Sequence, residues 1–156
     1  MLDRFRELGI NGFHIKGYGS PATSLLDSML LFFEISKYDG SVGLFFLINA
    51  ILGMSALDIL GSEEQKQKIL PQVMKLEKFM SYGLTEPLKG SEAITLDTTA
   101  RKVEGGYLIN GAKRWIGNGA MADYFLIWAT NVNDNNKVQG FIMEKGDKGF
   151  EVQKMV

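Results

Sequence analysis

Cysteine is absent from this sequence of 156 residues, and histidine occurs once, as His14. Without cysteine the chain has no disulfide bond, no thiolate ligand for a metal and no cysteine nucleophile. The single histidine belongs to no HxxxH or HxxE pattern, so no credible transition-metal site remains. These absences exclude disulfide scaffolds, thiol chemistry and zinc-type catalysis for the residues of this chain.

A dominant charge of one sign is also lacking. The chain has 17 basic and 18 acidic residues, a net charge of −1, and no block of lysine and arginine. Proteins that bind nucleic acid neutralise phosphates with clustered basic side chains, so we expect no nucleic-acid partner. Residues 1–4 lead directly into a helix-like pattern, and no signal or transit peptide is recognisable among them.

The longest uncharged run, residues 40–57, reaches the lower length limit of a transmembrane helix. It also contains Ser41, Asn49 and Ser55, and no basic residue flanks it directly. A helix that is buried on all sides in a soluble bundle has the same composition. We therefore expect a buried helix here rather than a membrane span.

Hydrophobic residues in the first half of the chain recur at helical spacing. The pattern predicts a short helix over 2–8, a glycine-rich loop over 9–20 and a helix from Pro21 to about Lys37. The core-facing stripe of this last helix is expected to consist of Leu25, Leu26, Met29, Leu30 and Phe33.

Two further helices have clear signals at their ends. Asp39 can cap the uncharged helix, which we expect to end near Gly61. Ser62 and Gln65 have the spacing of a capping box at the start of the next helix. Together the helices predict an all-α domain over residues 1–78.

From Phe79 onward the hydrophobic residues alternate at strand spacing between glycine and asparagine turns. Short strands linked in this way indicate a small antiparallel barrel or sandwich. The second predicted domain spans residues 79–156, which makes the expected fold class α+β. The expected strands are 80–84, 98–102, 107–109, 113–116, 124–129, 138–143 and one that begins at 149.

Residues 83–92 mark the change from helical to strand spacing and read Gly-Leu-Thr-Glu-Pro-Leu-Lys-Gly-Ser-Glu. Such a loop can bring backbone N–H groups and the Ser91 hydroxyl close to an anionic or heterocyclic ligand. By its chemistry alone, a surface turn between two domains is equally compatible with this stretch. A second stretch, 113–118, reads Lys-Arg-Trp-Ile-Gly-Asn.

Both stretches closely resemble signature segments of the acyl-CoA dehydrogenase and acyl-CoA oxidase flavoproteins. Residues 15–19 and 61–66 resemble parts of the helical domain of this family. The resemblance covers the chain from about residue 8 to its end. It implies an N-terminal helical domain packed on a middle β-barrel domain, with FAD as the cofactor and acyl-CoA as the substrate.

The resemblance also implies roles for individual residues. Ser91 matches the family serine near the flavin pyrophosphate and the acyl-CoA thioester arm, and Trp115 would form an aromatic wall against the flavin. Without the family, Trp115 would be interpreted as a core residue and Ser91 as an ordinary loop hydroxyl. Glu86 and Pro87 look structural, because they can order the turn. The implied cofactor-binding residues are Tyr82, Leu84, Thr85, Ser91, Trp115, Ile116 and Gly117.

Three residues depart from the family pattern: Lys89, Glu92 and Gly117 stand where a small residue, an aspartate, and a threonine or serine are usual. Lys89 could meet an acidic group of CoA, although an exposed loop lysine is the simpler interpretation. Gly117 lacks the hydroxyl that the dehydrogenases direct at flavin N5, and the space could admit dioxygen. In this respect the stretch is most similar to plant peroxisomal short-chain acyl-CoA oxidases, although a glycine that suits a tight turn is the alternative.

Glutaryl-CoA dehydrogenases resemble the chain almost as well. They typically hold the distal substrate carboxylate with an arginine just after the region of Asp39, and residues 40–44 contain no arginine. A buried carboxylate without a partner is costly, so a short, uncharged acyl chain is the implied substrate. His14 and Tyr18 could border the acyl pocket, although packing of their loop is the simpler interpretation.

In this family the catalytic glutamate lies beyond the equivalent of Val156, so no residue of this chain is assigned as catalytic. The first hypothesis is the N-terminal part of an FAD-dependent acyl-CoA oxidoreductase of the peroxisome or mitochondrial matrix. The missing C-terminal half or other subunits would then complete it in a homo- or hetero-oligomer. The second hypothesis is a non-catalytic structural or interaction subunit that docks its β edge and apolar helix on partners.

Overall fold

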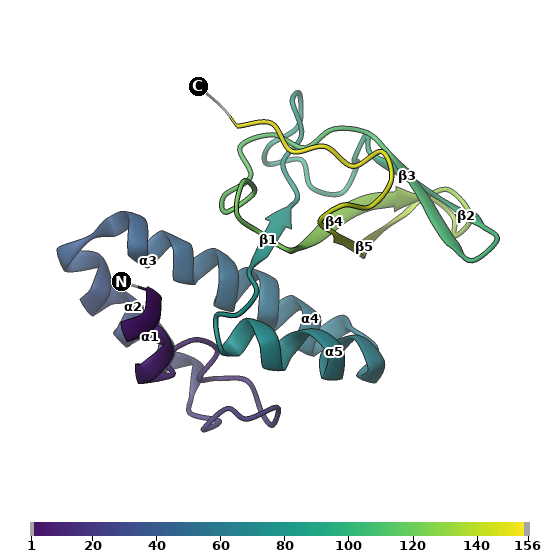
Figure 1. The fold of residues 1–156 in the computed structure, drawn as a ribbon. Coiled ribbons are helices and arrows are strands. Elements are labelled where there is room, and N and C mark those ends of the chain that lie inside the picture. The colour runs from purple at the N-terminus through teal and green to yellow at the C-terminus, as the bar shows by residue number, and fades with distance from the viewer. Residues whose placement is uncertain (1, 155–156) are drawn as a thin grey trace.

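The computed structural model describes residues 2–154 and contains a helical part and a β part that pack on each other (Figure 1). The expected order, helical domain first and β-sheet domain second, is confirmed. The elements are α1 (Leu2–Leu8), α2 (Leu25–Tyr38), α3 (Gly40–Phe46), the π-helix η1 (Leu47–Met54), α4 (Ser55–Leu60), α5 (Glu63–Met74), β1 (Met80–Gly83), β2 (Thr99–Val103), β3 (Gly106–Asn110), β4 (Tyr124–Asn131) and β5 (Lys137–Glu144).

Helix α2 begins later than its sequence pattern predicts. The predicted start at Pro21 is wrong, because the next residue, Ala22, has a φ of 55°, which no right-handed helix tolerates. Ser24 caps the helix instead: its hydroxyl accepts a hydrogen bond from the Asp27 N–H at 3.1 Å. The Asp27 carboxylate accepts the Ser24 N–H at 3.0 Å in return, which completes a capping box.

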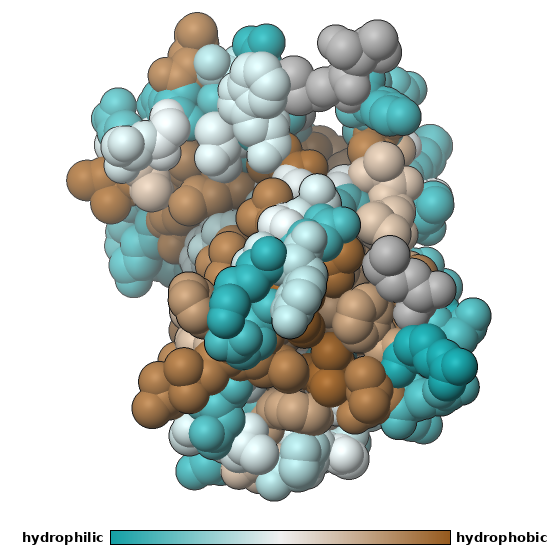
Figure 2. Space-filling model, turned by 90° about the vertical axis from the view of Figure 1, so that its left-hand side faces the viewer, coloured by the Kyte–Doolittle hydropathy of each residue, from teal (hydrophilic) through white to brown (hydrophobic). Residues whose placement is uncertain are grey.

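The prediction of which α2 residues face the core is wrong, because the predicted residues face solvent. The buried residues of α2 are Ser28 and Phe32, and the Phe32 ring stacks on Phe46 of α3 at a centroid distance of 5.6 Å. Figure 2 shows hydrophobic side chains gathered on the side of the molecule that carries α2 and α3 in Figure 1. Because α2 is apolar on more than one face, spacing alone could not select the buried face. The exposed residues are Leu25, Leu26, Met29, Leu30 and Phe33.

Helices α3, η1 and α4 form one continuous helical run over Gly40–Leu60. Asp39 caps its start by accepting the N–H groups of Ser41 and Val42, as predicted for this aspartate, and Gly61 follows its end. The run is long and apolar enough to cross a membrane by composition, but a core helix passes the same test. Of the most apolar stretch of 18 residues in this run, 44% is buried within the chain. The expectation of a helix buried on all sides is therefore wrong.

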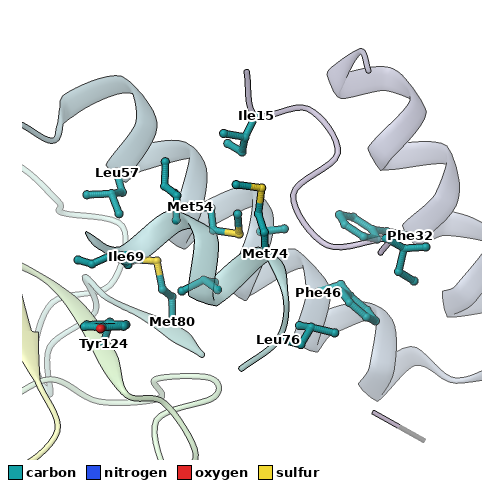
Figure 3. Packing of buried hydrophobic residues seen from close by; sticks show 14 residues of the cluster. Ile15, Phe32, Phe46, Met54, Leu57, Ile69, Met74, Leu76, Met80 and Tyr124 are labelled. Carbon is teal, nitrogen blue, oxygen red and sulfur yellow. The ribbon is translucent and has the colours of Figure 1, made fainter. Parts of the chain in front are cut away.

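The main hydrophobic core joins the helices to the sheet (Figure 3). Met80 of β1 and Tyr124 of β4 pack into the same cluster as Met54 of η1 and the α5 residues Ile69 and Leu70. Burial of each such side chain stabilises the fold by about 1.5–3 kcal/mol. The strand that leads into residues 84–92 is therefore held by the helical part.

The sheet has five strands in the order β1-β4-β2-β3, and β5 pairs with β4 along its other side. Pairs β2–β3 and β4–β5 are antiparallel, as predicted. Pairs β1–β4 and β2–β4 are parallel, so the expectation of a purely antiparallel domain is wrong for them. The loop over 84–98 returns the chain to the same direction, and β1 and β2 therefore meet β4 in the same orientation.

The sheet curls so that its outer strands approach each other. Tyr107 of β3 and Phe141 of β5 have ring centroids 5.0 Å apart. A second small core forms inside the curl around Ala122, Phe125 and Ile127. The segments 113–116 and 149–152, predicted as strands, are irregular in the structure, and within residues 2–154 β5 pairs only with β4.

Candidate functional site

The candidate site is built from the loop that follows β1 and the irregular segment that precedes β4. A buried ion pair joins them: Lys113 Nζ lies 2.9 Å from Glu86 Oε1, and both side chains are shielded from solvent. Lys113 Nζ also donates a hydrogen bond to the Leu84 carbonyl at 3.0 Å. One lysine thus ties the two motif segments together at two points.

Glu86 organises its own loop as well. Its two carboxylate oxygens accept the backbone N–H groups of Asp97 at 2.6 Å and Thr98 at 2.8 Å. Burial alone would raise the pKa of Glu86, but hydrogen bonds from Thr98, Lys113 and Asp97 lower it to about 2. Burial lowers the pKa of Lys113, while the adjacent Glu86 carboxylate acts in the opposite direction. Glu86 is therefore ionised at neutral pH, which supports its expected role in ordering the turn.

The ion pair brings Trp115 next to the loop. The Arg114 N–H donates to the Thr85 carbonyl at 2.9 Å, so residues 84–86 and 113–114 run side by side. Trp115 has a φ of 61°, which is unusual for a bulky residue, and the residue remains 67% exposed. An exposed tryptophan on a strained backbone is typical of a functional site rather than of a core.

The helical part anchors the other end of the Trp115 segment, residues 113–118. Ser81 of β1 donates its hydroxyl to the Gly117 carbonyl at 2.8 Å, and the Asn118 side chain donates to the Phe45 carbonyl at 3.2 Å. Asn49 of η1 is fully buried and accepts the Met80 N–H at 2.7 Å. The site thus lies where η1, β1 and the Trp115 segment meet, and π-helices are frequent at functional sites.

Gly117 does not open the space predicted for it. A Cβ atom added to Gly117 would lie 2.1 Å from Ile48 Cδ1, so the η1 side chain already fills this position. The prediction of free space beside residue 117 is therefore wrong for the described chain. The motif at 113–118 and the helical spacing around Ile48 do not predict the contact between Ile48 and Gly117, because the two residues are distant in sequence.

The remaining predicted residues differ in their exposure. Tyr82, Leu84, Thr85 and Ile116 are half-buried, and Ser91 is exposed at the outer end of the loop. Burial raises the pKa of Tyr82. The structure therefore brings Leu84 and Thr85 beside the Trp115 segment, whereas Ser91 forms no hydrogen bond with that segment within residues 2–154.

Lys89 and Glu92, which depart from the family pattern, form their polar contacts with other residues of the same loop. Lys89 Nζ lies 2.9 Å from Asp97 Oδ1 and also donates to the Thr95 carbonyl, so the interpretation as a freely exposed lysine is wrong. Glu92 accepts the hydroxyl of Thr95. Both side chains close the loop on itself.

His14 and Tyr18 pack their own loop on the helices. His14 Nε2 lies 2.7 Å from the Ser55 hydroxyl, its Nδ1 lies 3.3 Å from that of Ser28, and burial lowers its pKa. Tyr18 donates its hydroxyl to Glu63 at 2.6 Å. These contacts agree with loop packing, the simpler of the two interpretations.

The chemistry of the site fits a flavin. An exposed indole offers a stacking surface for a flat heterocycle. The hydroxyls of Thr85 and Ser91 form no hydrogen bond to other residues in the part of the chain that the structure describes, and so can donate to a ligand.

Comparison with known proteins relates the whole chain to acyl-CoA dehydrogenases. The acyl-CoA dehydrogenase N-terminal domain matches residues 1–77, and the acyl-CoA dehydrogenase middle domain matches residues 81–156. A short-chain-specific acyl-CoA dehydrogenase of Clostridium acetobutylicum is 38% identical over 90% of this chain and 38% of its own length. A mitochondrial isovaleryl-CoA dehydrogenase of Solanum tuberosum is 37% identical over 96% of this chain and 36% of its own.

A solved structure shares the fold closely. The glutaryl-CoA dehydrogenase of Mycobacterium smegmatis in complex with FADH2 has a TM-score of 0.92 and 31% identity, and the match covers 99% of this chain. It covers 39% of that protein, so the chain spans well under half the length of its relatives. The relatives named above are dehydrogenases, and the predicted likeness to plant oxidases finds no specific support in them.

Proposed function

Because the chain belongs to the acyl-CoA dehydrogenase family, we propose that it is the N-terminal and middle part of an FAD-dependent enzyme that dehydrogenates a short acyl-CoA. The observation that carries this proposal is the exposed Trp115, held at a positive φ beside Thr85 by the buried Glu86–Lys113 pair. An isolated structural domain would gain nothing from presenting a strained, uncovered tryptophan.

FAD would bind against Trp115 and the neighbouring loop. The ring would lie along Trp115, Ile116 and Gly117, and the Thr85 hydroxyl and the adjacent backbone would supply donors. Ser91 would approach the pyrophosphate and the thioester arm of the substrate. The residues proposed to hold FAD are Tyr82, Leu84, Thr85, Ser91, Trp115, Ile116 and Gly117. When bound, the flavin supplies the acceptor for a hydride from the acyl chain.

The acyl chain is proposed to be short and uncharged. The start of α3, residues 40–44, contains no cation that could pair with a second carboxylate of the substrate. Leaving such a carboxylate buried and unpaired would cost several kcal/mol, about 3 or more. A glutaryl group is therefore disfavoured, although the glutaryl-CoA dehydrogenase of Mycobacterium smegmatis has the same fold.

We favour a dehydrogenase over an oxidase. Access of dioxygen to the flavin would need free space at Gly117, and Ile48 Cδ1 occupies that space. The relatives named above are also dehydrogenases. The acceptor of the electrons would therefore be another redox protein or carrier rather than dioxygen.

We propose that the base that removes the substrate proton comes from outside residues 2–154. Glu86 is engaged by Lys113 and two backbone N–H groups, and Glu92 by Thr95, so neither is free to accept a proton. The part of the relatives that this chain does not span would supply the base and complete the oligomer. The mitochondrial matrix is the compartment we favour, by likeness to the Solanum tuberosum relative.

A titration of the purified chain with FAD tests the proposal. We expect a perturbed flavin absorption spectrum and quenched tryptophan fluorescence at saturation. Trp115→Ala should weaken binding at least tenfold, whereas the control Tyr38→Ala, at an exposed aromatic residue of α2, should retain it.

A chain that leaves the FAD spectrum unchanged at millimolar cofactor would contradict the proposal. The second candidate, a non-catalytic interaction subunit, would then be favoured by the exposed apolar side chains of α2. Capture of a partner through that face would be lost in Leu26→Lys.

A further inference from the structure

The guanidinium of Arg114 lies over the ring of Trp115, against which the flavin is proposed to stack. Its guanidinium carbon is 4.8 Å from the centroid of the Trp115 ring, within the range of a cation–π contact. Side chains of consecutive residues in an extended segment point to opposite sides. The positive φ of Trp115 breaks this alternation and lets the two neighbouring side chains stack.

The backbone of Arg114 is held at two points that lead up to this contact. Its N–H donates to the Thr85 carbonyl at 2.9 Å, and the preceding Lys113 is pinned by Glu86. Among residues 2–154 no acidic side chain forms an ion pair with Arg114. The site thus presents a positive charge without a partner, stacked on an aromatic ring.

Trp115 remains 67% exposed although a guanidinium covers one of its faces. Most of the accessible ring surface therefore belongs to its opposite face and its edges. A flat aromatic ligand can stack on that face without displacing Arg114. The geometry is that of an incomplete stack with one free side.

We propose that Arg114 is a cofactor-positioning residue that backs Trp115, so that bound FAD completes a stack of guanidinium, indole and isoalloxazine. This inference rests on the proposed function. Arg114 holds the indole in the orientation that receives the flavin. Its charge also favours the reduced flavin, which is anionic, and so raises the midpoint potential of the bound cofactor.

The test compares FAD binding of the unmodified chain with three variants. Arg114→Met removes the charge and the planar group and should weaken FAD binding roughly two- to fivefold, in line with a cation–π contact at an exposed site. Arg114→Lys keeps the charge but loses the flat stack, so its loss should be smaller. Arg101→Met, at an exposed arginine of β2, is the matched control and should bind FAD as the unmodified chain does.

The midpoint potential of the bound flavin separates a positioning role from a merely structural one. It should fall in Arg114→Met and stay nearly unchanged in Arg114→Lys and Arg101→Met, all with unchanged thermal unfolding. Unchanged or tighter FAD binding by Arg114→Met would overturn the inference, since Arg114 would then be irrelevant or would block the ring face. Failure of the unmodified chain to bind FAD would instead overturn the proposed function, and this inference with it.

Discussion

Glu86 and Lys113, 27 residues apart in sequence, meet at 2.9 Å in a place that solvent does not reach. The pair ties the loop after β1 to the Trp115 segment, and three backbone groups complete its hydrogen bonds: the Leu84 carbonyl and the N–H groups of Asp97 and Thr98. A buried ion pair stabilises a fold only when its remaining hydrogen bonds are satisfied in this way.

Removal of one partner of this pair should be strongly destabilising. Lys113→Met leaves the Glu86 carboxylate buried without its counter-charge, and we expect the free energy of unfolding to fall by about 3–5 kcal/mol. Urea denaturation followed by circular dichroism measures it. The matched control Lys137→Met, at an exposed ion pair with Asp134, should change stability by less than about 1 kcal/mol. Equal effects of the two variants would contradict the buried pair.

Glu86 should also make the free energy of unfolding depend on pH in the acidic range. Its pKa in the folded chain is about 2, below the 4.5 of an unperturbed glutamate, so the unfolded state binds the proton more readily. The stabilisation is therefore complete above about pH 4.5 and is lost as the pH falls towards 2. Glu86→Gln should flatten the stability profile in this window, and an unchanged slope would show that other groups cause it.

The contact between Gly117 and Ile48 predicts a compensating pair of substitutions. Gly117→Ala places a methyl group in the volume of Ile48 Cδ1 and should destabilise the chain by about 1–3 kcal/mol. Ile48→Val removes that carbon atom, and the double variant should recover part of the loss. A double-mutant cycle in urea measures the coupling. Strictly additive effects would mean that Ile48 does not occupy the position.

Substitutions on the two faces of α2 should change the stability of the chain by very different amounts. Leu26→Lys, on the exposed face, should change the free energy of unfolding by no more than about 0.5 kcal/mol. Phe32→Ala, on the buried face, should cost about 3–5 kcal/mol because it removes the stack on Phe46. Thermal unfolding of both variants distinguishes the faces. A large effect of Leu26→Lys would show that this face is buried in solution.

Sequence reasoning was accurate where a few neighbouring residues decide the structure. The Asp39 cap and the Ser62–Gln65 capping box occur as predicted, because each needs only side chains within three residues of the helix start. The β2–β3 hairpin around Gly105 is equally local. The motif at 83–92 pointed to the family because it preserves a combination of residue types at fixed spacing.

The sequence by itself determined that helices precede strands, which family the chain resembles and which residues are candidates, since these depend on local spacing and motif identity. Only the tertiary structure decided that Lys113 pairs with Glu86, that Ile48 fills the space at Gly117, and that α2 turns its leucines outward. Each of these contacts joins residues from separate elements. Their geometry follows from how helices and sheet pack together, which no local pattern encodes.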